Sequence, residues 1–326
     1  MSKYYTGFFS FLGNRVSYSD SLIVYYGIVG AIILAMILVW VFKRQIFQKY
    51  QNWKIRTENS AKKEEIMIRT AGAATLLFMI LRAALLVYFR YPIYWENIPL
   101  HLCRFNITLL GFFLLINKPQ YTKYILAFSF IGALIALFAP DLKNTMTEDT
   151  YYVDGVFYQN GKSVFKWSKG YDSYIFWDYL LAHGFILLAP IVLMIMFDLK
   201  LTLKDVYITS ALNLGAIIVA SIFNAISGHV AQTPGWQINY FYTGMDEFNK
   251  YHKTLGPLTK WPMITLTFSF VALLYLLLFL GLYFWQDKLV FEVEGKKMKL
   301  KVKKSTTYEA FKNSWIEANN RKPITD

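Results

Sequence analysis

The fold of this chain is indicated by its first apolar run, SLIVYYGIVGAIILAMILVWVF, at residues 21–42, which contains no charged residue. An α-helix rises about 1.5 Å per residue, so about 20 apolar residues cross the roughly 30 Å hydrocarbon core of a bilayer. A cleaved signal peptide would be shorter and would follow a basic N-terminal region. We therefore interpret residues 21–42 as a true membrane span.

Further apolar runs of similar length follow along the chain. With the first, they predict spans at about 21–42, 70–90, 98–117, 122–139, 174–197, 206–230 and 262–285. The composition agrees, because 56% of the residues are hydrophobic, 18% are aromatic and only 17% are charged. We predict an all-α polytopic protein, with a seven-span membrane domain at 1–285 and a small basic tail at 286–326. The one cysteine excludes an internal disulfide.

The positive charge is placed as membrane orientation requires. The net charge is +13, and its excess lies in the first, third and fifth loops and in the tail. The loop residues are Lys43, Arg44, Lys49, Lys54, Arg56, Lys62 and Lys63, then Lys118 and Lys123, then Lys200 and Lys204. Cytoplasmic loops carry such an excess, so we expect the N-terminus outside and the C-terminus in the cytoplasm of a multi-pass cell-membrane protein. The same distribution argues against a nucleic-acid partner and leaves membrane lipids as the expected one.

Two soluble segments carry local signals. In the loop at 140–173, Asn160-Gly161 between aromatic-rich runs predicts a small hairpin. In the tail, apolar residues alternate on both sides of Gly295, which predicts a two-stranded ribbon followed by an amphipathic helix with Tyr308, Phe311 and Trp315. The alternative for the tail is a solvated basic segment at the anionic inner leaflet.

Polar residues of four predicted spans fall in the same outer half of the bilayer. They are Arg82, Cys103, Asp178, His183, Asn224 and His229. By helical rise, Cys103 lies roughly 8 Å, Arg82 roughly 12 Å and His183 roughly 13 Å below the outer surface. Ionisable groups at such depth usually face a protein interior and serve a function. We infer a polar cavity open toward the outer leaflet.

Cys103 has two interpretations. A free cysteine is often a small buried hydrophobe. Here it lies in the first turns of a predicted helix, beside Arg104 and with Asn106 on its face, which favours a thiolate nucleophile. Helical positions i and i+2 point about 200° apart, so His101 is not the expected partner. His183, surrounded by apolar neighbours, is the better base, although a helix-to-helix hydrogen bond would also explain it.

Arg82 needs a carboxylate or an anionic ligand at mid-depth. The protein carboxylate could be Asp178, and the anionic ligand could be a phosphate or carboxylate headgroup. Asn224, with Ser221 and Ser227, forms a stripe that is also typical of helix packing. The residues we expect to bind substrate are Arg82, His101, Arg104, Asn106, Asp178, Asn224, His229 and Tyr240.

A zinc site would need ligands from His101, Cys103, His183 and His229. No two of them have the i, i+4 spacing that makes such sites recognisable, so we expect no metal and no cofactor.

Three segments suggest a family. Pro99-Leu100-His101-Leu102-Cys103, a later Asn239-Tyr240-Phe241-Tyr242 and Lys260-Trp261-Pro262 resemble the YwaF-type bacterial integral membrane proteins. That group is similar to the transmembrane protein 164 acyltransferases and, more distantly, to the androgen-induced membrane hydrolases. The resemblance covers about residues 20–285 and implies that Cys103 is the nucleophile and His183 the histidine of an enzyme acting on fatty acyl chains.

We expect a membrane-embedded acyltransferase or thioesterase-like lipid hydrolase. Cys103, activated by His183, would attack an acyl ester, and Asn224 or Asn106 would hydrogen-bond the developing oxyanion. The alternative is a transporter or lipid-binding protein in which Arg82 and His101 bind an anionic small molecule. A transporter should show broken helices and polar groups that continue to the inner side of the membrane. The inner halves of these spans contain few polar residues.

Overall fold

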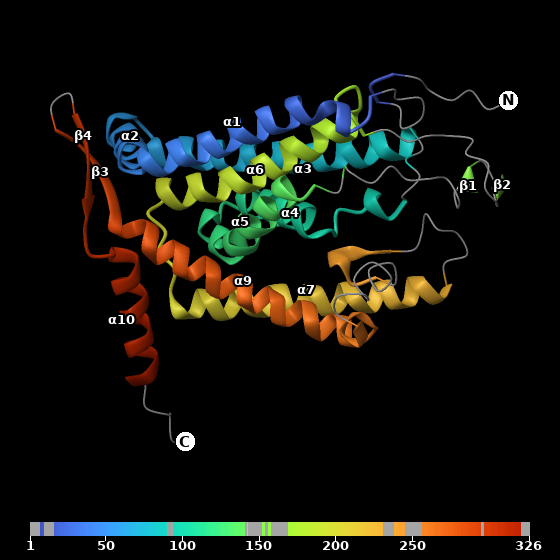
Figure 1. The fold of residues 1–326 in the computed structure, drawn as a ribbon. Helices are drawn as coiled ribbons and strands as arrows, with labels where there is room; N and C mark the ends of the chain where they lie inside the picture. The colour runs from blue at the N-terminus through green and yellow to red at the C-terminus, as the bar shows by residue number, and fades with distance from the viewer. Residues whose placement is uncertain are drawn as a thin grey trace.

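The computed structural model describes residues 7–9, 16–89, 91, 94–140, 142, 152–153, 156–157, 169–230, 238–244, 256–294 and 297–320. Within these ranges, seven helices are long and apolar enough to cross a membrane (Figure 1). The chain is therefore an all-α multi-pass membrane protein, as its apolar runs predicted.

The membrane helices follow the predicted spans closely. They are α1 (Leu22–Val41), α3 (Ser60–Tyr88), α4 (Leu102–Leu115), α5 (Lys123–Phe138), α6 (Tyr174–Met196), α7 (Leu203–Val230) and α9 (Met263–Lys288). The 3₁₀ turns η2 (Tyr94–Asn97) and η3 (Pro119–Thr122) precede α4 and α5. The first basic loop contains a further helix, α2 (Lys43–Arg56). Helix α3 begins well before residue 70, because the charged residues at 62–65 are good helix formers and extend it beyond its apolar part.

The helices lie side by side, with the two termini toward opposite ends of the bundle (Figure 1). We call these ends the N-terminal end, where α1, α4 and α6 begin, and the tail end, where α2 and the C-terminal elements lie. In Figure 1, α1 and α3 form one side, α7 and α9 the other, and α4, α5 and α6 lie between them. The closest packed pairs include α3 with α4 and α5 with α6.

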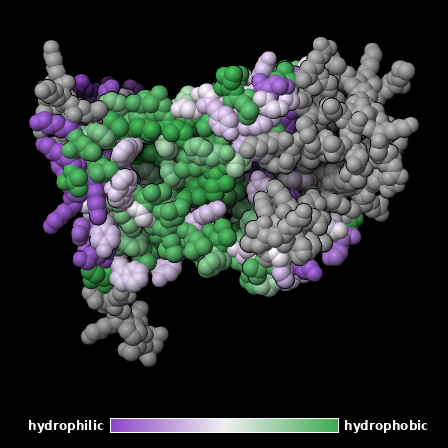
Figure 2. All heavy atoms as spheres, in the orientation of Figure 1, coloured by the Kyte–Doolittle hydropathy of each residue, from purple (hydrophilic) through white to green (hydrophobic). Residues whose placement is uncertain are grey.

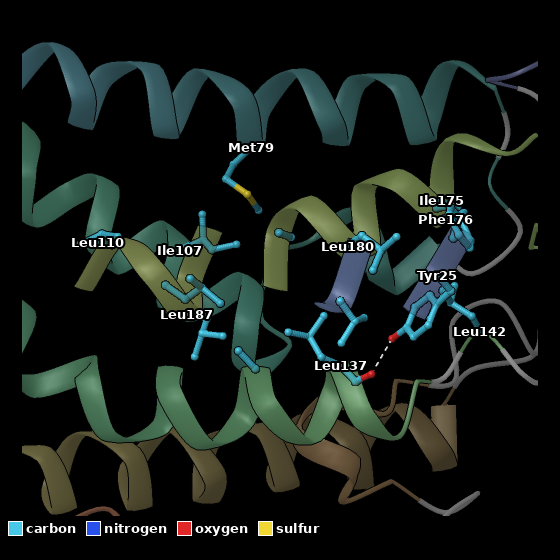
Figure 3. Packing of buried hydrophobic residues seen from close by; sticks show 14 of the residues in the cluster. Tyr25, Met79, Ile107, Leu110, Leu137, Leu142, Ile175, Phe176, Leu180 and Leu187 are labelled. Carbon is cyan, nitrogen blue, oxygen red and sulfur yellow. Dashed lines mark hydrogen bonds between the residues drawn. The ribbon is translucent and has the colours of Figure 1, made fainter. Parts of the chain in front are cut away.

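The interior is filled by aliphatic and aromatic side chains from the central helices. Figure 3 shows Met79, Ile107, Leu180 and Leu187 converging from α3, α4 and α6. Tyr25 of α1 is fully buried and donates its hydroxyl to the Leu137 carbonyl at 2.9 Å. A buried tyrosine needs such a partner, and this one joins α1 to α5.

Glycine permits the tight contact between α3 and α4. A Cβ atom built at Gly72 would lie 2.3 Å from the Leu115 backbone nitrogen, closer than atoms can approach. Small residues let membrane helices approach through their backbones, so Gly72 fixes this packing.

The outer surface matches a bilayer. Large apolar side chains such as Ile23, Ile80 and Phe270 are 90%, 65% and 63% exposed. Figure 2 shows such residues as a broad green band, with hydrophilic residues toward the ends of the molecule. A surface of this kind is stable only when lipid covers it.

The predicted ribbon and helix of the tail are both present. Strands β3 (Leu289–Glu294) and β4 (Lys297–Val302) pair antiparallel, and α10 (Thr306–Asn320) follows. The rings of Tyr308 and Phe311 lie 5.6 and 5.2 Å from that of Phe284 on α9. Asp287 accepts a hydrogen bond from the Thr307 amide at 3.0 Å. The tail is therefore fixed to the end of α9.

The loop at 140–173 contains a short two-stranded hairpin that precedes the predicted turn. Strands β1 (Tyr152–Val153) and β2 (Val156–Phe157) pair with Val153 opposite Val156. In the sequence, the dipeptide Asp154-Gly155 lies between these strands, and Asp-Gly is a preferred hairpin dipeptide. Asn160-Gly161 lies outside the described residues.

Candidate functional site

Helix α4 begins later than the apolar run suggested, and this changes the relation between His101 and Cys103. The helix starts at Leu102, and His101 precedes it in extended conformation (φ −69°, ψ 145°). Pro99 disfavours helical backbone at Ile98, so the helix does not begin at the start of the apolar run. The expected 200° separation of His101 and Cys103 was therefore wrong, because it requires both residues to be helical. His101 instead lies between aromatic rings, 6.2 Å from Trp95 and 4.6 Å from Tyr242 between centroids.

Cys103 is the second residue of α4 and is half-buried. The backbone N–H groups of a first turn have no partner within their helix and favour a negative charge nearby. Gly132 of α5 lies opposite. A Cβ atom built there would be 3.9 Å from Cys103 Sγ and 3.2 Å from Leu102 Cδ2. A side chain at this position would crowd Leu102, so glycine lets α5 pack close to the thiol.

His183 is buried in α6 with a defined tautomer. Its Nδ1 lies 2.7 Å from the Tyr179 carbonyl oxygen. A carbonyl oxygen can only accept, so Nδ1 carries the proton and Nε2 carries the free electron pair. Among the described residues, no hydrogen bond to Nε2 is present. The ring can thus take a proton at Nε2.

The contact between α5 and α6 relates His183 to Cys103. The Tyr179 hydroxyl donates to the Ala136 carbonyl at 2.7 Å. His183 lies on the same face of α6 as Tyr179, one turn closer to the tail end. On the antiparallel α5, Gly132 lies one turn closer to the tail end than Ala136. One turn covers about 5.4 Å on both helices, so His183 lies at about the level of Gly132. Cys103 Sγ faces that same glycine.

Arg82 is paired within the protein. Its Nε donates to Asp178 Oδ2 at 2.9 Å, and its Nη1 donates to the Glu96 carbonyl at 2.9 Å. Arg104 also donates through Nη2 to the Asp178 carboxylate. The Glu96 carboxylate lies 3.9 Å from Arg82 Nη2 and accepts from the Tyr91 hydroxyl at 3.0 Å. Two arginines thus meet two carboxylates, and the ion pair explains Arg82 without a ligand.

Asn224 is a structural clamp. Its amide nitrogen donates to the Tyr240 carbonyl and to Thr243 Oγ1, both at 2.8 Å, and its Oδ1 accepts from the Tyr240 amide at 3.0 Å. The Tyr240 hydroxyl donates to the Trp95 carbonyl at 2.8 Å. Burial raises the pKa of Tyr240 to about 12, so this hydroxyl stays protonated. The turn at 238–244 is thereby fastened over the start of α4.

The remaining expected residues separate into two cases. His229 is exposed at the end of α7 and does not face the interior. Asn106 is 0% exposed, one turn after Cys103, and neither atom of its amide group has a hydrogen-bond partner among the described residues. The structure thus brings Arg82, Arg104 and Asp178 together, joins Asn224 to Tyr240, and leaves His229 apart.

Sequence reasoning missed several contributors. Glu96 and Tyr91 complete the charge cluster, and Gly132 lies beside the thiol. Tyr179 could have been found, because a residue four positions before a helical histidine is placed to accept from its Nδ1–H. Gly132 carries no local signal, since its role depends on which helix faces it.

When the sequence is compared with models of known protein families, the model of the TMEM164 family matches residues 17–280. This chain belongs to the TMEM164 family. The matched region contains every membrane helix almost completely and ends within α9, so the β3–β4 ribbon and α10 lie outside it. No curated protein and no solved structure matches the chain.

Proposed function

We propose that this TMEM164-family protein is a cysteine-dependent lipid acyltransferase or hydrolase, with Cys103 as nucleophile and His183 as base. The observation that carries the proposal is the tautomer of His183, whose Nε2 is left unprotonated. By helical rise, His183 lies at about the level of Gly132, the glycine that Cys103 faces. An activated thiol needs such a base. The resemblance of the Pro99–Cys103 segment to the YwaF-type proteins supports the same roles.

The reaction has two halves. His183 Nε2 takes the proton from Cys103 Sγ, and the thiolate attacks the carbonyl carbon of an acyl ester. Collapse of the tetrahedral intermediate breaks the C–O bond, His183 returns the proton to the leaving alcohol, and an acyl thioester remains on Cys103. Water or the hydroxyl group of a second lipid then attacks the thioester, and the same steps run in reverse order. Attack by water gives hydrolysis, and attack by a lipid gives acyl transfer.

Two features near the thiol favour its ionisation, against the cost that burial imposes on a charged group. Cys103 lies in the first turn of α4, where the helix dipole stabilises negative charge. Arg104 follows it in the chain, and its Nη1 is buried without a hydrogen-bond partner among the described residues. A positive group beside a thiol favours the thiolate, and the ion pair of Arg104 with Asp178 reduces this effect.

The substrate is a membrane lipid that reaches the site from the side. The positive-inside pattern assigns the N-terminal end, and with it Cys103, to the outer half of the cell membrane. Headgroup recognition by Arg82 has little support, because Asp178 and Glu96 already balance its charge and that of Arg104. We therefore assign Arg82 and Asp178 to holding α3, α4 and α6 together.

Mass spectrometry of the purified protein tests the proposal. After incubation with lipid vesicles, the peptide that contains Cys103 should carry an acyl group that neutral hydroxylamine removes. The Cys103→Ser variant should retain at most an ester that resists this treatment, and Cys103→Ala should carry no acyl group. Lipid remodelling at the wild-type rate by both variants would refute the nucleophile.

A further inference from the structure

Two fully buried polar side chains lie beneath Cys103, between α4 and α5. Asn106 and Ser129 are both 0% exposed. Neither the amide atoms of Asn106 nor the Ser129 hydroxyl has a hydrogen-bond partner among the described residues. Buried polar groups are nearly always satisfied, so such a group calls for a specific explanation.

Their positions relative to Gly132 bring the two side chains into the same interface. Gly132 of α5 contacts Leu102 and Cys103 of α4. Asn106 follows Cys103 by one turn along α4, and Ser129 precedes Gly132 by one turn along the antiparallel α5. Both steps lead about 4.5 Å toward the tail end, so both side chains lie at about the same depth below the thiol.

Both residues carry a hydrogen-bond donor that the described residues leave unused. Asn106 offers Nδ2–H and Ser129 offers Oγ–H. In an α-helix the side chain leans toward the N-terminus, so the Asn106 amide rises toward Cys103, whereas the Ser129 hydroxyl on the antiparallel α5 lies deeper. The reacting carbonyl of an acyl ester must lie beside Sγ during the attack, about one turn above these two side chains.

We propose that Asn106 and Ser129 form the oxyanion hole of the acyl-transfer site, one turn below Cys103 and Gly132. This inference rests on the proposed function. When Sγ bonds to the carbonyl carbon, the C=O π electrons move to the oxygen, and the resulting oxyanion accepts hydrogen bonds from Asn106 Nδ2 and Ser129 Oγ. When the intermediate collapses, the oxygen regains its double bond, the C–O ester bond breaks, and the leaving alcohol takes the proton from His183.

The test compares two reactions of the same thiol. Acylation by a long-chain p-nitrophenyl ester passes through an oxyanion, whereas alkylation by iodoacetamide displaces iodide and does not. In detergent-purified Asn106→Leu and Ser129→Ala variants, we expect acylation of Cys103 to slow about 100-fold, as for loss of an oxyanion donor. The alkylation rate and its pH profile should stay within about twofold of the wild type, since oxyanion donors act only on the acyl intermediate.

The matched control is Asn213→Leu. Asn213 is also a buried membrane asparagine, 1% exposed with its Oδ1 unsatisfied among the described residues, and it lies on α7. In this variant, Cys103 should be acylated at the wild-type rate. Ser129→Ala removes a single oxygen atom, so this variant can carry the test alone if Asn106→Leu fails to fold.

The outcomes separate the two proposals. If the wild type forms no thioester on Cys103, the proposed function fails, and the oxyanion hole fails with it. If the wild type is acylated and both variants are acylated equally fast, only the oxyanion hole is overturned. An equal loss of acylation and alkylation also overturns it, because the two residues would then act on the thiol or on the fold.

Discussion

Arg82 and Asp178 form a buried ion pair between α3 and α6, with Nε 2.9 Å from Oδ2. The arginine side chain is 5% exposed and the aspartate side chain 2%. Because Arg104 shares the same carboxylate, one aspartate holds two cations from two other helices. The pair therefore fixes how α3, α4 and α6 meet at the N-terminal end.

Asp178→Ala should destabilise the protein strongly. Removing one partner of a buried pair leaves an uncompensated charge and costs about 3–5 kcal/mol. Denaturant unfolding in mixed micelles measures the loss. Glu65→Ala is the control, because the Arg69–Glu65 pair is half exposed and such pairs are worth about 0–1 kcal/mol. Equal losses in the two variants would mean that the buried pair does not anchor the helices.

His183→Gln should slow thioester formation on Cys103 by about 10²–10⁴-fold, because the general base is lost. The rate of acylation by an activated ester measures this. Tyr179→Phe is the matched control, since it removes the hydroxyl bonded to Ala136 but keeps the carbonyl that orients His183. A His183→Gln protein acylated as fast as the wild type would exclude His183 as the base.

Asn224→Leu should release the turn at 238–244. The variant loses the three hydrogen bonds that join Asn224 to Tyr240 and Thr243. Hydrogen exchange of the Tyr240 amide should become at least tenfold faster, because this amide donates to Asn224 Oδ1. The control Asn213→Leu should leave that exchange unchanged. Unaltered protection in Asn224→Leu would show that the turn is held by other contacts.

The number and placement of the membrane helices could be predicted, because each span is an apolar run long enough to cross a bilayer. The sequence left two alternatives for Arg82, an ion pair with Asp178 or an anionic ligand. It could not decide between them, because the ion pair depends on the rotation of α6 relative to α3. The clamp between Asn224 and Tyr240 and the contact of Gly132 with Cys103 could not be predicted. Both depend on how helices distant in the sequence pack, which no local pattern encodes.

The orientation of the protein can be tested with single cysteines in a Cys103→Ala background. Tyr171→Cys lies before α6 at the N-terminal end, and Lys312→Cys lies on α10 at the tail end. Because the basic segments gather at the tail end, a membrane-impermeant maleimide should label Tyr171→Cys in intact cells. It should label Lys312→Cys only after permeabilisation. The reverse pattern would place the thiol site on the cytoplasmic side.

Gly72→Ala should disrupt the packing of α3 on α4. The added Cβ would lie 2.3 Å from the Leu115 nitrogen and 2.7 Å from the Gly111 carbonyl oxygen, and these backbone atoms of α4 cannot move aside cheaply. Overpacking of this kind costs about 1–3 kcal/mol or more, which unfolding in mixed micelles detects. Gly27→Ala in α1 is the matched control, because nothing lies within 4 Å of a Cβ there. Alanine in an open helical position should stabilise the helix by about 0.5–1 kcal/mol. If both substitutions had the same effect, α3 and α4 would not be in backbone contact at Gly72.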